Sequence, residues 1–517
     1  MKRAAVWALV ATALFTCYWR QSQVTEVTSD GASVALQAWS MLHGNLLLHG
    51  WDLSDVSFYT TEIPQYLLIE LVTGLGPWVV HIAAASTYTL LVLLAAAVAK
   101  GGTHGVEGLA RALLAGGIIV APQLDLTRAL LASPDHVGSA VPVMLAWLVI
   151  GYFERRTDAP GWIAPASVCV ILTVGDTADA IVLLTGIIPL LVACTARLVR
   201  TRAASRRPDL LLIAAAAGAA FLGAAIPRWV RAAGGYQLQP VSTAITLGHL
   251  GQAARATAQN VLDVFGADFL TARPGIQVAA AILHLVGVIA VCVACCIAAG
   301  RLVRSRLAGG RPEDELVVTG LLAGIAINLA AYMFTAHGQS SSNVREIAAV
   351  MPLGAALAGR VLGAHLVTAR ARQLRLAPAL GVVAAGYLLA LCYAIAQPYA
   401  PGTDQVLAQW LAAHDLTDGL AGYWNANVTT LDSDGRTHVD CTWGSGGLAP
   451  CNWETWAADY DPNTNRASFY VLDDSDGSAQ ATIERVFGPA SLIYHTAGHI
   501  VLVWNENMLV HLSPRAP

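Results

Sequence analysis

Long apolar runs constrain the fold of this chain more than any other feature of its sequence. About eleven runs approach the roughly 17–25 residues that a helix needs to cross a bilayer. They lie near residues 4–19, 77–99, 108–123, 137–153, 161–175, 177–196, 209–226, 276–299, 315–335, 347–367 and 377–396. Only 12% of the residues are charged, about half the share in a soluble protein. The pattern predicts a mainly α-helical, polytopic protein of the cell membrane and excludes a disordered chain.

The basic residues indicate how these spans are oriented. If the N-terminus is cytoplasmic, the short connections on that side carry about 18 basic residues, whereas the longer connections opposite carry few. Basic residues of short loops stay in the cytoplasm, so we expect N-in, and an odd number of spans then exports the C-terminus. Residues 4–19 could instead be a signal peptide. A retained span is favoured because no small-x-small cleavage site follows.

The composition changes near residue 397. From there to the end, 14 acidic residues face four arginines and the apolar runs shorten. The segments 467–472, 481–486 and 499–504 have the alternating or short β-branched pattern of strands. We therefore predict a transmembrane domain over 1–396, with external loops near 20–76 and 227–275, and a small extracytoplasmic α+β domain over 397–517.

Two features of this outer domain indicate its chemistry. Cys441 and Cys451 are close in sequence, and an oxidising compartment favours a disulfide between them. Five of its tryptophans could stack on sugars, but most are expected in the core of so small a domain. The five are Trp424, Trp443, Trp453, Trp456 and Trp504. The chain has no basic block with interleaved aromatic residues, which excludes nucleic acid as a partner.

The first external loop gathers acids, histidines and aromatic residues between two amphipathic stretches. Such stretches can lie flat at the membrane interface, so the polar residues between them can form a pocket there. Asp30, Asp55 and Glu62 are its candidate acids. His43 and His49 could bind a divalent cation together with nearby acids, but no ligand spacing is diagnostic, and the metal stays unknown.

The layout of the whole chain resembles the GT-C class of polyprenyl-phosphate-sugar-dependent glycosyltransferases. It is most similar to protein-mannosyltransferase-like and lipid A aminoarabinose-transferase-like members, and it also resembles a set of actinobacterial membrane proteins. The shared pattern is one span, a long outer loop with an acid just past the membrane, about ten further spans and an outer domain. The local sequence is specific at Ser29-Asp30-Gly31, Val344-Arg345-Glu346 and Gly422-Tyr423-Trp424-Asn425-Ala426-Asn427.

The resemblance implies a reaction and a base. A polyprenyl-phosphate-linked sugar enters from the outer leaflet, and an unknown acceptor attacks its anomeric carbon with inversion. Asp30 matches the position of the class's general base, which a carboxylate within hydrogen-bond reach can be. The alternative is that Asp30 caps a helix that starts near Ala32; the layout favours the base.

A second acid of the class usually comes from the next external loop. Asp135 and His136 are the candidates here, and a helix-capping role for Asp135 is an equal alternative. The sequence departs from the class in having neither an acidic doublet at Asp30 nor an Asp-x-Asp in the second loop. Asp176 lies between two apolar runs and belongs either to the site or, as we favour, to a tight external hairpin.

The phosphate of a lipid donor requires cations, and arginine suits bidentate phosphate contacts. Arg345 precedes a span on the outer side, and a binding role is favoured for it. For Arg228, a snorkelling position at the interface is the favoured alternative. Two other functions compete with glycosyl transfer, namely transport or flipping of a lipid-linked or polar solute and a catalytically inactive binding module. The sequence lacks the internal repeats and paired broken helices that are typical of transporters.

Overall fold

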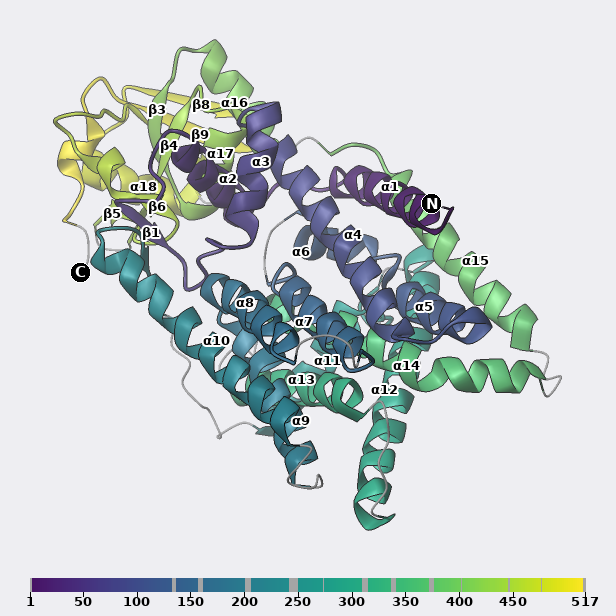
Figure 1. Ribbon diagram of the computed structural model, residues 1–517. Helices are drawn as coiled ribbons and strands as arrows, with labels where there is room; N and C mark the ends of the chain where they lie inside the picture. The colour runs from purple at the N-terminus through teal and green to yellow at the C-terminus, as the bar shows by residue number, and fades with distance from the viewer. Residues whose placement is uncertain are drawn as a thin grey trace.

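The predicted apolar runs all form helices. A computed structural model describes residues 2–132, 136–156, 161–199, 206–240, 250–272, 274–308, 315–335, 341–371, 376–400, 402–444, 447–475 and 477–514. The helices at the predicted runs are α1 (Lys2–Ser22), α4 (Trp78–Lys100), α5 (Gly105–Ile119), α7 (Ala140–Phe153), α8 (Ile163–Ala178), α9 (Ile188–Leu198), α10 (Arg207–Ala232), α12 (Ile276–Ala308), α13 (Glu315–Phe334), α14 (Val350–Ala371) and α15 (Leu376–Ile395) (Figure 1).

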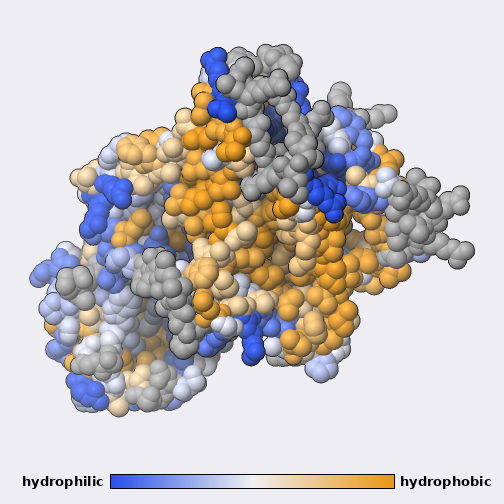
Figure 2. All heavy atoms as spheres, turned by 90° about the horizontal axis from the view of Figure 1, so that it is seen from below, coloured by the Kyte–Doolittle hydropathy of each residue, from blue (hydrophilic) through white to orange (hydrophobic). Residues whose placement is uncertain are grey.

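Among the described residues, five helices are long and apolar enough to cross a membrane. They are Trp78–Lys100, Arg207–Ala232, Ile276–Arg304, Leu316–Phe334 and Val344–Thr368. A sixth results if α5 and the segment Leu124–Leu131, which contains α6 (Thr127–Leu131) and meets α5 at an angle of 74°, form one broken span. The other predicted runs form shorter or less apolar helices, such as the 14-residue α7. Figure 2 shows an apolar surface over the helical part of the molecule, as expected of a protein embedded in lipid.

The C-terminal part is built on a six-stranded mixed sheet with the order β5-β4-β3-β7-β9-β8. The strands are β3 (Asp418–Ala421), β4 (His438–Trp443), β5 (Ala449–Pro450), β7 (Phe469–Asp473), β8 (Leu492–Thr496) and β9 (His499–Val503). Side chains alternate between the two faces. Phe469 and Val471 face the core under α16 (Thr403–Ala413) and α17 (Tyr423–Asp432), whereas Tyr470 and Leu472 face the core under α18 (Gly477–Phe487).

One strand prediction in this domain is wrong. Residues 481–486 lie within α18 and not in a strand. Ile483 and Phe487 are spaced i, i+4 and both are buried against the sheet, which is helical periodicity. Gln480 also donates to Glu484 one turn later. The six-residue window was too short to show this period. Cys441 and Cys451 are paired by a disulfide in this domain, with a Cα–Cα distance of 5.4 Å.

A second, smaller sheet joins the two external loops to the C-terminal domain. It has the order β2-β1-β6 and consists of β1 (Trp51–Leu53), β2 (Gln237–Leu238) and β6 (Thr455–Trp456). β1 comes from the first external loop, β2 from the second and β6 from the outer domain. Figure 1 shows β1, α2 (Ser29–Leu42) and α3 (Glu62–Thr73) beside that domain, although they are close to the N-terminus in sequence. Segments far apart in the chain therefore meet at one place.

Glu454 reinforces this junction. Its side chain is 3% exposed, and its carboxylate accepts hydrogen bonds from Ser33 at 2.9 Å and Gln37 at 2.5 Å, both on α2. The backbone amide of Ser54 donates to the other oxygen at 3.0 Å. Burial raises the pKa of Glu454 to about 7, although the hydrogen bonds from Ser54 and Ser33 lower it. The outer domain is thus linked to α2 by a buried carboxyl group whose ionisation is unfavourable.

The junction predicts a pH-dependent stability. A carboxyl whose pKa rises from 4.5 to about 7 on folding costs stability as the pH rises through that interval. Glu454→Gln keeps the shape and cannot ionise, so it should remove up to roughly 3 kcal/mol of this dependence. Thermal unfolding of the purified protein between pH 4.5 and 7.5 measures it. Glu506→Gln, an exposed acid, is the control. Equal pH profiles for Glu454→Gln and wild type would contradict the account.

Candidate functional site

Asp30 lies in the first turn of α2 but does not cap it. The N-cap is Thr28, whose hydroxyl accepts from the amide of Gly31 at 3.1 Å, so the capping alternative for Asp30 is wrong. A Cβ on Gly31 would lie 3.0 Å from Val80 of α4 and 3.1 Å from the carbonyl of Ala132. Glycine therefore allows the start of α2 to pack closely on the helical part, which fixes Asp30 beside it.

Three distant segments meet at the Asp30 carboxylate. Nη1 of Arg345, in the 3-10 helix η5 (Ser341–Ile347), lies 3.0 Å from Oδ2. The hydroxyl of Tyr423, the first residue of α17, donates to Oδ1. Asp30 is 17% exposed and Arg345 is 34% exposed. The pair is sheltered by protein and still open to a small ligand.

A second charged group adjoins the first through Glu346. His136 Nδ1 lies 2.7 Å from Oδ2 of the buried Asp179, and its Nε2 lies 3.5 Å from Oε1 of Glu346. Ser139 donates to the same Asp179 oxygen, and the amide of Ile181 donates to the other at 2.9 Å. His136 adopts a φ of 50°, a conformation that non-glycine residues adopt only when their surroundings enforce it.

These two groups form one site, which we term the outer cluster: Asp30, His136, Asp179, Arg345 and Glu346. Burial lowers the pKa of His136, but Asp179 and Glu346 outweigh it and hold the pKa well above its usual value. The imidazole is therefore a cation at neutral pH. Three carboxylates then face two cations, so the site carries net negative charge with positive groups at defined places.

Two other predicted acids lie next to the outer cluster. Glu62 is buried at the start of α3 and packs against Gly138, where a Cβ would overlap its carboxylate. Burial raises its pKa to about 7, and the charges of Asp179 and His136 also act on it. Asp55 is exposed, but desolvation by the surrounding protein raises its pKa; His136 lowers the pKa and Glu346 raises it. Asp135, the second predicted catalytic acid, lies outside the described residues.

The remaining predicted residues have other surroundings. Asp176 packs against Gly223 of α10. Arg228 is exposed on α10, and its guanidinium donates to the carbonyl of Ala224 at 3.1 Å. His43 Nδ1 lies 2.8 Å from the Trp39 carbonyl, and His49 Nδ1 lies 2.7 Å from the Gly234 carbonyl. In each of these two candidate metal ligands, one ring nitrogen therefore already lies within hydrogen-bond distance of a backbone carbonyl.

Sequence reasoning assigned no role to Tyr423, Glu346 or Glu454. The first two lie in the local segments that carry the family resemblance, so a signal existed. Glu454 had none, because its partners on α2 are more than 400 residues away. The expectation that most tryptophans of the outer domain are core is also wrong. Trp504 is buried, but Trp424, beside Tyr423, is 56% exposed, and Trp443 and Trp456 are exposed as well.

Comparison with solved structures identifies the architecture. ArnT from Cupriavidus metallidurans bound to undecaprenyl phosphate aligns with a TM-score of 0.56 and 13% identity, over 97% of this chain and 98% of that one. The chain has the ArnT fold. The predicted GT-C architecture is thereby confirmed.

Two further structures align over most of the chain. ArnT from the same organism in the apo state has a TM-score of 0.44 and 12% identity, over 99% of this chain and 100% of that one. The Archaeoglobus fulgidus oligosaccharyltransferase in the apo form has a TM-score of 0.49 and 13% identity, over 93% and 70%. No family model and no curated protein sequence matches the chain.

The outer cluster predicts that His136 stabilises the fold. His136→Gln removes the cation beside buried Asp179 and should cost about 2–4 kcal/mol, since a buried charge then loses its partner. The stability that protonated His136 contributes is fully present below about pH 6.5. It is lost as the pH rises through the raised pKa of His136 in the folded protein. Thermal unfolding from pH 6 to 10 measures both effects.

His495→Gln is the matched control, because His495 also pairs with an aspartate, Asp474 at 3.2 Å, but is 67% exposed. It should change stability by less than about 0.5 kcal/mol. An equal loss of stability in the two variants would show that the buried pair at His136 contributes no more than an exposed one.

Proposed function

We propose that this protein is an integral membrane glycosyltransferase that moves a sugar from a polyprenyl-phosphate donor to an acceptor on the extracytoplasmic side. The observation that carries the proposal is the meeting of Asp30, Arg345 and Tyr423 from three distant segments within an ArnT fold. In this proposal all eleven helices of the predicted runs cross the membrane with the N-terminus inside. The outer cluster and residues 397–517 then face the extracytoplasmic side.

The donor class is supported by the fold and by the charge of the site. The ArnT structure of the same fold is bound to undecaprenyl phosphate. Arg345 is the part of the outer cluster suited to a phosphate, because its guanidinium offers paired N–H donors. Trp424, whose ring packs against that of Tyr423 at 5.1 Å between centroids, is 56% exposed, and aromatic faces bind sugar rings by their apolar side.

In the proposed reaction Asp30 is the general base. Its carboxylate accepts the proton of the acceptor hydroxyl or amine while the acceptor forms a bond to the anomeric carbon. The bond between that carbon and the phosphate oxygen breaks on the opposite face, so the configuration inverts and polyprenyl phosphate leaves. Glu346 and Asp179 add negative charge, which stabilises an oxocarbenium-like centre, and they hold His136 as a cation.

This geometry requires a rearrangement on donor binding. In an inverting reaction the acceptor attacks the anomeric carbon from the side opposite the phosphate. The base therefore lies at one end of this line and the phosphate-binding cation at the other, about 8 Å apart. Nη1 of Arg345 and Oδ2 of Asp30 are 3.0 Å apart in the structure. We propose that the donor phosphate takes Arg345 away from Asp30 and thereby releases the base. Tyr423 keeps the carboxylate oriented during the exchange.

Roles of the other predicted acids follow from their places. Asp55 is exposed beside the outer cluster and is proposed to bind sugar hydroxyls. Glu62 has a pKa of about 7 and is proposed to donate a hydrogen bond in its neutral form. The binding roles of Asp176 and Arg228, and the catalytic role of Asp135, stay predictions.

One observation fits the competing proposal of a transporter or flippase. α5 and the segment Leu124–Leu131 form a pair bent by 74° at a short break, and broken helices are typical of transport sites. A transporter would move the lipid-linked or polar solute without breaking its glycosidic phosphate bond. An assay of bond cleavage therefore separates the two functions.

The general base is tested by Asp30→Asn. Purified protein is given radiolabelled polyprenyl-phosphate sugars with a panel of acceptors, and release of polyprenyl phosphate is measured. The variant should lose at least about 100-fold in kcat, the usual range for loss of a general base. Asp125→Asn, an exposed acid in the second outer connection, should retain full activity. Unchanged turnover in Asp30→Asn would overturn the assignment, and no turnover with any donor would favour transport.

Arg345 is tested by a pair of substitutions. Arg345→Gln removes the cation and should lower kcat/KM for the donor by roughly 100-fold, whereas Arg345→Lys should retain part of it as a point charge. The measurement is donor binding by titration together with steady-state kinetics. Donor affinity that is the same in wild type and Arg345→Gln would exclude Arg345 from the phosphate site.

A further inference from the structure

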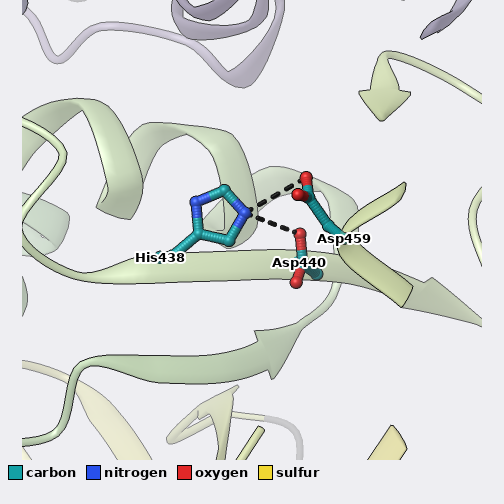
Figure 3. A group of neighbouring side chains, drawn as sticks. All are labelled: His438, Asp440 and Asp459. Carbon is teal, nitrogen blue, oxygen red and sulfur yellow. Dashed lines mark ion pairs between the residues drawn. The ribbon is translucent and has the colours of Figure 1, made fainter. Parts of the chain in front are cut away.

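A group of three potential ligands lies in the C-terminal domain, apart from the outer cluster. His438 and Asp440 are on β4, and Asp459 is on the 3-10 helix η6 (Ala457–Tyr460). Figure 3 shows the imidazole pointing toward the two carboxylates. Within the described part of the chain, this is the group of histidine and acidic side chains whose ligand atoms all lie within 4.8 Å of one another.

The strand itself creates half of this arrangement. His438 and Asp440 are two residues apart, so both project from the same face of β4. Cys441 projects from the opposite face, where it is buried and bonded to Cys451. Tyr460, next to Asp459, donates its hydroxyl to the carbonyl of Cys441 at 2.6 Å. Strand, disulfide and η6 thus fix all three side chains.

The distances suit the ligands of one metal ion as well as they suit an ion pair. Nε2 of His438 lies 3.1 Å from a carboxylate oxygen of Asp440 and 3.1 Å from one of Asp459. Ligands about 2.0–2.2 Å from a zinc ion, at the angles of a tetrahedron or octahedron, stand about 3.0–3.5 Å apart. Nε2 is also a buried atom for which the described residues supply no partner at hydrogen-bond angles. Figure 3 shows one oxygen of each aspartate on the side of the ring that carries this nitrogen.

The charge of the group also favours a cation. Two carboxylates face one imidazole, and Asp418 on the neighbouring strand acts on Asp440 as a third acid. Even a protonated imidazole would leave net negative charge, which a divalent ion neutralises.

The geometry points to a divalent transition-metal site, of the kind that zinc occupies, formed by His438, Asp440 and Asp459. One imidazole and two carboxylates are a ligand set that zinc accepts, with water completing the coordination. The function of the ion is to tie η6 to β4. η6 directly follows β6, the strand that pairs with β1 of the first external loop. The same segment begins at Glu454, which binds α2 near Asp30. The bound ion therefore holds in place the part of the outer domain that supports the outer cluster.

Calorimetry tests the site directly. The full chain is purified in detergent without a histidine tag, treated with EDTA and titrated with zinc chloride. Wild type should bind zinc saturably, and Asp459→Asn and His438→Ala should each lose at least 10-fold in affinity for one equivalent. His495→Ala is the matched control, because His495 and Asp474 are an exposed pair in the same domain; it should bind as wild type does. Near-UV circular dichroism without zinc verifies that each variant is folded.

Hydrogen exchange locates the effect. Zinc should slow amide exchange in residues 455–460 of wild type and of His495→Ala, but not of Asp459→Asn. Wild type that shows no saturable zinc binding would overturn the proposal, and the group would then be an ion pair only. Equal binding by wild type and Asp459→Asn would also overturn it. Because these readouts measure binding and exchange, they do not depend on glycosyl transfer.

Discussion

The carboxylate of Asp30 is held by two partners that are both more than 300 residues away along the chain, and this contact joins three segments of the structure. Arg345 reaches it from η5, and Tyr423 reaches it from the first turn of α17. Ionised side chains sheltered from water require such partners. The α2 start, η5 and α17 must therefore be positioned together, which the close packing at Gly31 and the hydrogen bonds of Glu454 achieve. The fold thus places a carboxylate and a guanidinium side by side where three distant segments meet.

The helical part of the fold was predictable because a lipid environment leaves a simple pattern in the sequence. A spanning segment must be apolar over many residues, and each predicted run is a helix in the structure. The signal is weaker for the outer domain, where segments are short and half-buried. Residues 481–486 were predicted as a strand for that reason, although Ile483 and Phe487 have helical spacing.

The candidate site was predictable only in part. Asp30 and Arg345 belong to segments with a local signature, whereas His136 was a candidate from its place in the next predicted external loop. The structure brings all three into the outer cluster. Glu346 and Tyr423 lie in the same local segments, but their contacts with His136 and Asp30, like that of Asp179 with His136, arise only in the tertiary fold. Glu454 illustrates the same limit, because its partners on α2 are distant in sequence. In the His438 group the spacing on β4 brings two side chains together, and only the tertiary fold adds Asp459.

A structure of the protein with a polyprenyl-phosphate sugar bound tests the central claim most directly. The account predicts that the donor phosphate contacts the guanidinium of Arg345 within about 3 Å, and that Asp30 is released from Arg345 and faces the anomeric carbon from the opposite side. A donor whose phosphate binds elsewhere, or an Asp30–Arg345 pair that stays at 3.0 Å with the donor bound, would contradict it.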